Sequence, residues 1–183
     1  MRIGQEGQSG LDEAWIERWR ADVRTGIGEL LSIFEPRFGF PPGEHEVSGP
    51  ATAAELAGLA DLHGGDLPAD LLLFHQVVAE VRLPDINNGY WIHRPPLPGE
   101  DPDHPRRLSD GRTVIVFGSG GGGALFAMSA GKDAPVLRLS GGALTGETYD
   151  ADGATAVAAN LQDFLAFLRR EVTEFVGSAK CSR

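Results

Sequence analysis

The sequence predicts an α+β fold, with a central, mostly antiparallel sheet and helices packed around it. Two observations predict this fold. Apolar residues recur at spacings of three and four near both ends of the chain, and short runs rich in β-branched and aromatic residues, separated by glycine and proline, fill much of residues 89–149. A chain of 183 residues, 42% of them hydrophobic, can bury a core as one domain.

A long amphipathic helix is predicted over residues 11–34. Its apolar face consists of Leu11, Trp15, Ile16, Trp19, Val23, Ile27, Leu30, Leu31 and Phe34. Glycines at positions 26 and 28 weaken this helix by about 1 kcal/mol each relative to alanine, which favours a bend or break there. Pro36 and the Pro41-Pro42 pair predict its end, so residues 1–49 are expected to form an N-terminal helical extension with a connector.

Two short helices are predicted next. Thr52-Ala-Ala-Glu55 fits a capping box, in which the hydroxyl and the carboxylate each satisfy a free backbone N–H, and Gly64-Gly65 ends this helix. Leu67-Pro68-Ala-Asp70 begins another helix, with proline at or near the first position. Both helices are short, so we expect them to pack against a sheet.

Four strands and a weaker fifth are predicted. They are Gly89–His93, Thr113–Gly118, Ala124–Ser129, Pro135–Ser140 and a weak strand around Glu147–Tyr149. Val114–Phe117 is apolar on both sides, as in a central strand. Residues 95–105 are rich in proline and acid, which predicts an exposed loop.

A C-terminal helix is predicted from Asn160, a good N-cap, with Asp163 at a position where a carboxylate favours the helix start. The α+β domain is therefore expected over residues 50–176, followed by a flexible tail at 177–183. The tail carries the single cysteine, Cys181, which excludes an internal disulfide and a cysteine zinc cluster.

The charge is concentrated in the middle of the chain. Residues 44–110 hold twelve acidic and four basic residues, a net charge of −8 out of −10 for the whole chain. Such a segment repels nucleic acid and anionic membranes and attracts basic partners, although it also suits a solvated surface that keeps the protein in solution. No run approaches the roughly 18 apolar residues of a membrane span, and the N-terminus has no apolar signal core, so the cytoplasm is the default location.

The glycine run from Gly118 to Gly123 has the composition of a phosphate loop but not its chemistry. A phosphate loop needs Gly-Lys-Ser/Thr after its glycines, whereas Ala124 follows here. We therefore interpret the run as a structural turn between two strands. The alternative is a ligand-contacting turn, in which Gly118, Ser119 and Gly120 approach a small ligand.

The remaining chemistry of the sequence is sparse. The five histidines lack the spacing of a helical zinc site, although His93 and His104 flank an acidic loop that could bind a cation opportunistically. Ser119 falls short of a Gly-x-Ser-x-Gly motif and would need a spatially close histidine and acid to act as a nucleophile. The sequence thus predicts no catalytic residues, no cofactor and no resident metal.

Aromatic residues beside acids are the best candidates for partner recognition, because such groups anchor a basic partner. The candidate partner-binding residues are Asp85, Asn88, Tyr90, Trp91, Glu100, Asp101 and Asp103. Trp91 could instead fill the core between the sheet and a helix.

The order of these motifs resembles the SUKH superfamily, which contains a fungal cell-wall-assembly regulator and many bacterial immunity proteins. The resemblance covers about residues 50–170, through Leu67–Asp70, Asn88–Gly89, Phe117–Gly123, Ala124–Met128 and Asn160–Leu165. It departs from the family pattern where Asn160-Leu161 replaces Ser-Phe and where the glycine turn lacks an aspartate. The resemblance implies an α+β domain that binds proteins, in many bacterial members a toxin, often a nuclease.

The leading hypothesis is a non-enzymatic SUKH-type domain, monomeric or homodimeric, that binds and neutralises a basic toxin domain rather than nucleic acid or a membrane. A second hypothesis is a small-ligand or enzymatic site at the glycine turn, residues 118–123. A third is a regulatory scaffold that self-associates through the first helix.

Overall fold

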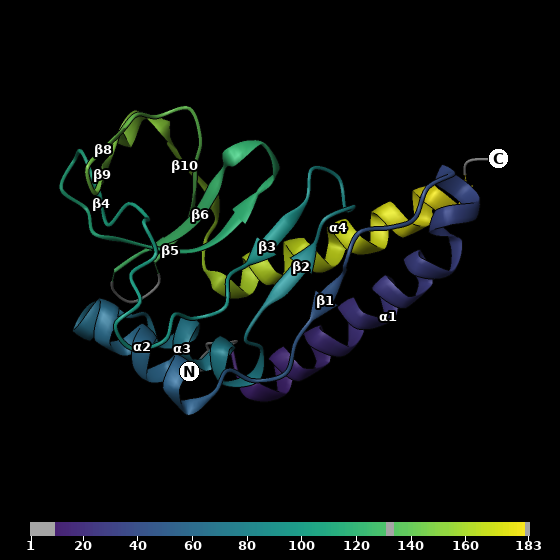
Figure 1. Cartoon of the computed structure of the whole chain (residues 1–183), viewed down its shortest axis with the longest axis horizontal. Helices are drawn as coiled ribbons and strands as arrows, with labels where there is room; N and C mark the ends of the chain where they lie inside the picture. The colour runs from purple at the N-terminus through teal and green to yellow at the C-terminus, as the bar shows by residue number, and fades with distance from the viewer. Residues whose placement is uncertain (1–9, 131–133, 182–183) are drawn as a thin grey trace, which may run out of the picture.

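The computed structural model describes residues 10–130 and 134–181, and it confirms an α+β fold (Figure 1). Within these residues the α-helices are α1 (Glu13–Phe38), α2 (Ala53–His63), α3 (Ala69–Val77) and α4 (Leu161–Cys181). Three short 3₁₀ turns, η1 (Gly64–Asp66), η2 (Gly121–Gly123) and η3 (Ala151–Gly153), join other elements. No helix in the described ranges has the length and apolar character of a membrane span.

The main sheet has seven strands in the order β1-β2-β3-β5-β6-β7-β10, and every neighbouring pair is antiparallel. Its strands are β1 (Glu46–Val47), β2 (Val81–Leu83), β3 (Tyr90–Ile92), β5 (Val114–Gly120), β6 (Leu125–Ser129), β7 (Val136–Leu139) and β10 (Ala154–Ala158). A second sheet contains β4 (Arg107–Leu108), β9 (Thr148–Tyr149) and β8 (Leu144–Thr145). The apolar strand β5 occupies the centre of the main sheet, as predicted.

The first helix is longer than predicted and is not broken at its glycines. It continues through Gly26 and past Pro36, and it ends at Gly39, whose φ of 80° and N–H bond to the Glu35 carbonyl close the last turn. A Cβ at position 26 would lie 2.6 Å from Val172 Cγ1, so glycine there lets α1 approach α4 closely instead of breaking the helix. Pro36 lies in the last turn, where it removes a single helical hydrogen bond.

The other helix starts follow the sequence prediction. The Thr52 hydroxyl accepts a hydrogen bond from the Glu55 N–H, and the Glu55 carboxylate accepts one from the Thr52 N–H, which confirms the capping box. Pro68 directly precedes α3, and the Asn160 side chain caps α4 by accepting from the Asp163 N–H.

The end of α4 differs from the predicted flexible tail. The helix continues through Cys181, Ala179 on it is buried, and Lys180 forms a 2.6 Å ion pair with Glu29 of α1. The tail sequence therefore extends the α1–α4 pair, because its small and basic residues suit the last turns of a helix. Residues 182–183 of the predicted tail lie outside the described part of the chain.

One face of the main sheet is covered by α4, with α1 beside it (Figure 1). The large buried side chains of this core include Ile16, Trp19, Leu30, Phe74, Ile92, Phe117, Phe126 and Phe164. The Trp19 indole N–H donates a 2.6 Å hydrogen bond to the Leu165 carbonyl, which ties α1 to α4. The amphipathic stripe of the first helix is therefore part of the core of this chain.

The opposite face of the main sheet is only half covered. The second sheet brings Leu108 and Tyr149 onto Val114, Leu137 and Leu139, and together these residues form a smaller core. Strands β1, β2 and β3 lie beyond this cover, and Figure 1 shows them in front of α4 with no described helix or strand drawn across them. We call this part of the sheet, centred on Arg82, Trp91 and Ser119, the open face.

Candidate functional site

The open face is built from one row of residues on four adjacent strands. Glu46 of β1 is paired with Arg82 of β2, Arg82 with Trp91 of β3, and Trp91 with Ser119 of β5. Paired residues of antiparallel strands point to the same side, so these four side chains share one surface. The alternate residues Val81, Leu83 and Ile92 point into the core on the other side.

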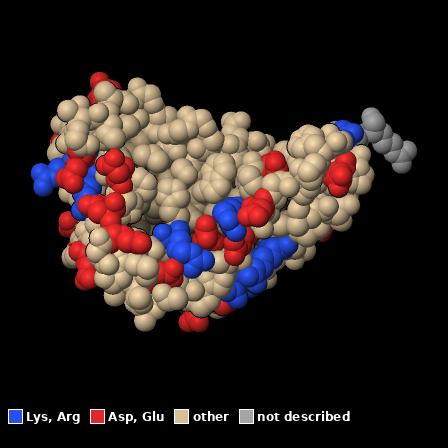
Figure 2. All heavy atoms as spheres, in the orientation of Figure 1, with Lys and Arg blue, Asp and Glu red and all other residues tan. Residues whose placement is uncertain are grey.

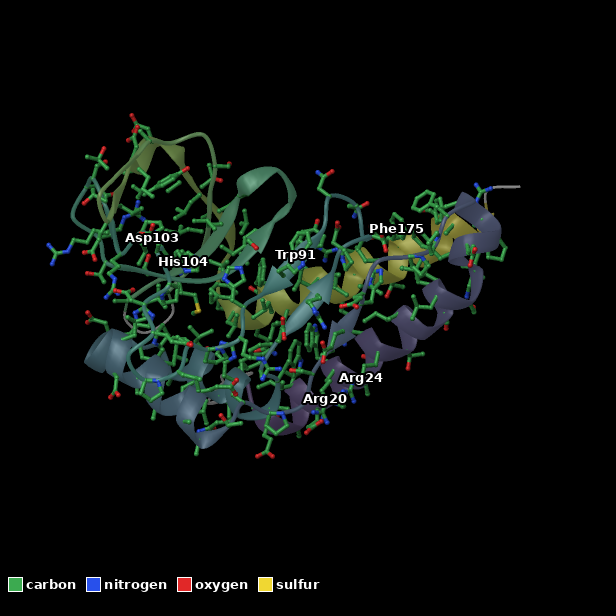
Figure 3. The ribbon with its side chains drawn as sticks, in the orientation of Figure 1. Arg20, Arg24, Trp91, Asp103, His104 and Phe175 are labelled. Carbon is green, nitrogen blue, oxygen red and sulfur yellow. The ribbon has the colours of Figure 1, made fainter. Side chains whose placement is uncertain are left out.

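Trp91 is the aromatic centre of the open face, as Figure 3 shows. Its side chain is half-buried and belongs to neither hydrophobic core. The indole ring packs over Gly89, where a Cβ would come within 2.4 Å of Trp91 Cη2, and Gly118 lies beside its carbonyl, where a Cβ would come within 2.5 Å. Gly89 thus makes room for the large ring, which keeps part of its surface accessible, and Gly118 lets β5 approach the backbone of β3.

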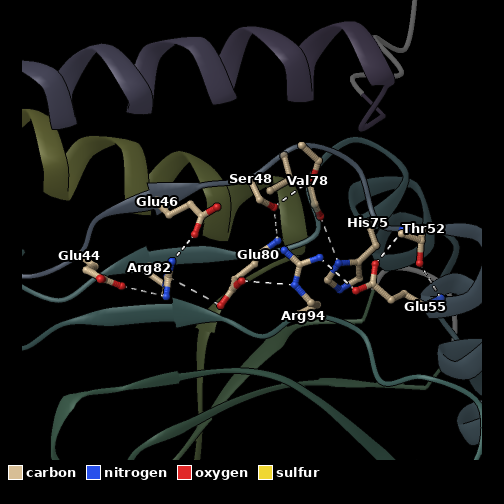
Figure 4. A network of polar contacts seen from close by, with 11 residues as sticks. Glu44, Glu46, Ser48, Thr52, Glu55, His75, Val78, Glu80, Arg82 and Arg94 are labelled. Atoms are coloured by element: carbon tan, nitrogen blue, oxygen red, sulfur yellow. Dashed lines mark hydrogen bonds and ion pairs between the residues drawn. The ribbon is translucent and has the colours of Figure 1, made fainter.

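A network of carboxylates and guanidinium groups (Figure 4) begins at Arg82, the cross-strand neighbour of Trp91. Arg82 pairs closely with Glu46, and its guanidinium also lies 3.5 Å from Glu44 and 3.9 Å from Glu80. Arg94 lies 3.4 Å from Glu80 and 3.0 Å from Glu55. Four carboxylates therefore surround two cations, which leaves this border with a net negative charge.

The network shifts the pKa values of its members in favour of their charged forms. The hydrogen bond that Arg82 donates to Glu46 raises the pKa of Arg82, and the hydrogen bond that Arg94 donates to Glu55 raises the pKa of Arg94. Burial acts to raise the pKa of Glu55, but hydrogen bonds from Thr52 and Arg94 together lower it below its usual value. These groups therefore stay ionised near neutral pH.

The other sequence-predicted recognition residues do not join Trp91 in one patch. Tyr90 points to the α4 side, where its hydroxyl donates a 2.9 Å hydrogen bond to Glu171; burial and this carboxylate raise the pKa of Tyr90 to about 12. Asp85 accepts hydrogen bonds from the Gly43 N–H and from His45, and so fixes the connector after α1. Asn88 is exposed at the tip of the β2–β3 turn.

The acidic loop residues form a second, separate group. Figure 3 shows Asp103 beside the second sheet, away from Trp91. Glu100 accepts a hydrogen bond from the Leu97 N–H, and Asp101 pairs with Arg106 at 2.5 Å. Within residues 10–130 and 134–181, no group of three or more His, Cys, Asp or Glu side chains has an arrangement that could hold a metal ion.

The structure does bring a histidine to Ser119. The Ser119 hydroxyl lies 2.9 Å from His93 Nε2, and the His93 ring stacks on His104 with 5.3 Å between ring centroids. Burial lowers the pKa of His93 to about 4, so the ring is neutral near pH 7. In the described chain no carboxylate hydrogen-bonds to His93, so the pair lacks the acid that would orient such a histidine as a base.

In the glycine turn, close backbone contacts or positive φ values require glycine at most positions. A Cβ on Gly121 would lie 1.7 Å from the Asn88 carbonyl oxygen, while Gly122 and Gly123 have φ values of 77° and 84°. The N–H groups of Gly120 and Gly121 donate to the carbonyls of Ala124 and Gly89. These two amides are therefore committed to the turn rather than directed at a phosphate.

Comparison of the chain with protein-family models and with curated proteins finds no match. The resemblance to the SUKH superfamily thus depends on the short motifs in the sequence. The open face is the surface whose chemistry bears most directly on function.

Sequence reasoning did not single out Arg82, Arg94, Glu46 and Glu80 as site residues. Strands β1 and β2 are two and three residues long, too short to show an alternating pattern. The only sequence signal was the excess of acid in residues 44–110, which contain all four.

Proposed function

We propose that this protein is a non-enzymatic protein-binding domain of the immunity type, which binds and neutralises a basic toxin domain. The observation that carries the proposal is the open face: a sheet surface with a half-buried tryptophan at its centre and a carboxylate-rich border. The SUKH resemblance and the net charge of −8 in residues 44–110 support the same function. A cytoplasmic location is part of the proposal.

The shape of the open face suits an anchor residue. Tryptophan is enriched among the few interface residues that supply most of the binding energy, and such residues lie near the centre of a patch that excludes water. Trp91 has this position, with Arg82 on one side and Ser119 on the other. A partner side chain packed on the indole would remove its remaining exposed surface from water.

The charge at the border selects the partner. Glu44, Glu46 and Glu80 gather around Arg82, and Figure 2 shows acidic and basic side chains interleaved in a band across this side of the molecule. A lysine or arginine of the partner can add to this network, whereas a nucleic-acid phosphate would meet an excess of carboxylates. Complementary charge also speeds the encounter and makes it sensitive to salt.

The proposal is tested by co-expression with the product of the neighbouring reading frame, followed by affinity measurement at low and high salt. We expect Trp91→Ala to weaken binding by about thirtyfold or more, which corresponds to a central interface residue. The matched control is Phe40→Ala, because Phe40 is 53% exposed but lies after the far end of α1.

A second pair of variants tests the charge. Glu44→Lys should weaken binding and reduce its salt dependence, while Glu174→Lys on the exposed side of α4 should leave both unchanged. A basic partner that binds all four variants with equal affinity would overturn the assignment of the open face. The absence of any salt-sensitive basic partner would overturn the proposed function itself.

A further inference from the structure

A pocket of about 340 Å³ lies beside the glycine turn, on the side of the sheet that α4 covers. It is lined by Tyr90, Gly120, Phe126, Arg138, Val157 and Phe167, among others. This volume is at the lower end of the range for small-molecule sites, about 300–1,000 Å³. The pocket and the open face are on opposite sides of the main sheet, so an inference about one does not depend on the other.

The walls of the pocket are aromatic. The Tyr90 ring stacks near Phe126, with 6.4 Å between centroids, and meets Phe167 edge to face at 5.8 Å. Val157 adds an aliphatic wall and is 44% exposed, a large fraction for a valine. Because the pKa of Tyr90 is raised to about 12, its phenol is uncharged near neutral pH. These walls suit a flat apolar group of one or two rings.

One cation lies at the pocket. Arg138 of β7 is the cross-strand partner of Phe126, and its side chain is exposed. Its guanidinium forms no ion pair or hydrogen bond with any residue in the described ranges 10–130 and 134–181, and it acts on Tyr90 only through its charge. The nearby carboxylate of Glu171 accepts hydrogen bonds from Tyr90 and Asn87 on the same oxygen, Oε2. An unpaired guanidinium beside apolar rings favours a ligand with a planar anionic group, because arginine binds carboxylates through two parallel hydrogen bonds.

The glycine next to these rings keeps the pocket open. Gly120 is opposite Tyr90 in the sheet, and a Cβ on it would lie 3.5 Å from the Phe126 ring, at ordinary contact distance. Its backbone has φ −114° and ψ 168°, a strand conformation that any residue adopts. The conformation does not require glycine at position 120, yet a larger side chain would extend into the pocket.

We propose that this pocket binds a small aromatic carboxylate, with its ring packed against the wall formed by Tyr90, Phe126 and Phe167 and its carboxylate on Arg138. A phosphate fits poorly, because the amides of Gly120 and Gly121 are used within the turn and Arg138 is the one charged residue that lines the pocket in the described part of the chain. The proposal refines the ligand hypothesis for the glycine turn: the ligand contacts the side of the turn that faces α4, not its backbone amides.

The test is a titration of the full chain with 3-phenylpropionate, followed by NMR of the backbone amides. We expect shifts at Gly120, Gly121 and Phe167. The neutral isostere 3-phenylpropionamide should bind about tenfold more weakly, because it loses the charged hydrogen bonds to Arg138. Inorganic phosphate alone should leave these amides unchanged.

Two variants locate the site. Arg138→Gln should remove the preference for the acid over the amide, and Gly120→Val should abolish binding of both. Arg112→Gln is the matched control, because Arg112 is exposed and already paired with Asp110. Since the Arg138 side chain is exposed, its variant keeps the test decisive even if Gly120→Val fails to fold. Equal binding of acid and amide, or no shift at these amides, would overturn the proposal.

Discussion

His75 shows how a single buried residue fits its surroundings. It lies on α3 with 2% of its surface exposed, and its Nδ1 is 3.2 Å from the Val78 carbonyl, to which it donates. The ring lies in the interior near Glu55. The Val78 carbonyl accepts a hydrogen bond from the ring N–H, so the neutral ring is satisfied at this buried position.

His75 predicts a loss of stability in mild acid. Burial lowers its pKa from 6.5 to about 4, so between these values the unfolded chain binds more protons than the folded chain. The stabilisation is therefore fully present above the unfolded pKa and is lost as pH falls toward the folded pKa. Between pH 7 and pH 5 we expect the free energy of unfolding to fall by about 2 kcal/mol from this group.

Urea titrations of the parent protein and of His75→Asn at both pH values check this. Asparagine keeps a donor near the Val78 carbonyl but does not titrate, so its stability should depend less on pH. An unchanged pH dependence in the variant would assign the acid sensitivity to other groups, such as His93.

At the scale of elements, the apolar pattern of α1 correctly predicted a helix, but it did not reveal what that helix packs against. The apolar stripe predicted the helix, and six of its residues are buried: Ile16, Trp19, Val23, Ile27, Leu30 and Phe34. The sequence did not show that the stripe packs on α4 of the same chain. That contact joins residues 146 positions apart, as in the bond from Trp19 to Leu165, and local periodicity carries no information about it.

Replacement of Trp19 by alanine should therefore destabilise the whole protein. Trp19 is fully buried, touches Phe74 edge to face and donates to Leu165, so Trp19→Ala should cost about 3–5 kcal/mol. Leu31→Ala on the same helix is the control, since Leu31 is 43% exposed, and it should change stability by about 0.5 kcal/mol or less. Thermal or urea unfolding measures both. Similar losses for the two variants would mean that α1 does not dock as described.

The strands that the sequence predicted are those with a recognisable run of strand-forming residues. Four predicted strands correspond to β3, β5, β6 and β7, and the weak fifth around Glu147–Tyr149 corresponds to β9. Strands β1, β2, β4 and β8 have two or three residues each and contain no aromatic residue, so the sequence offered no such run there. Strand β10 is Ala-Thr-Ala-Val-Ala, whose small residues resemble a loop, and its pairing with β7 creates the strand.

At the scale of the whole molecule, the open face is a product of topology. Arg82, Trp91 and Ser119 come from three strands and meet only because β3 pairs with both β2 and β5. The sequence singled out Trp91 and Ser119 separately, and it grouped Trp91 with its neighbour Tyr90, which points to the other side of the sheet. Register decides which of two adjacent aromatic residues faces a partner, and register depends on distant pairing.

The same architecture predicts that the protein does not self-associate through its first helix. The apolar face of α1 is buried within its own chain, and the exposed apolar residues near its end are Leu31, Phe38 and Phe40, at 43%, 38% and 53%. Three partly exposed side chains fall short of the roughly 800 Å² per partner of a stable interface. Light scattering should therefore give the chain mass of 19.5 kDa, unchanged in Phe40→Ser. About twice that mass, reduced by the substitution, would favour self-association through the first helix.

Glu55 links the border of the open face to the first turn of α2. One of its oxygens accepts from the Thr52 N–H, and the other holds Arg94. A bound partner that pairs with Arg94 would break the ion pair between Arg94 and Glu55, and the first turn of α2 would lose that contact. Binding at the open face should therefore increase the rate of amide hydrogen exchange at residues 52–55, at the start of α2.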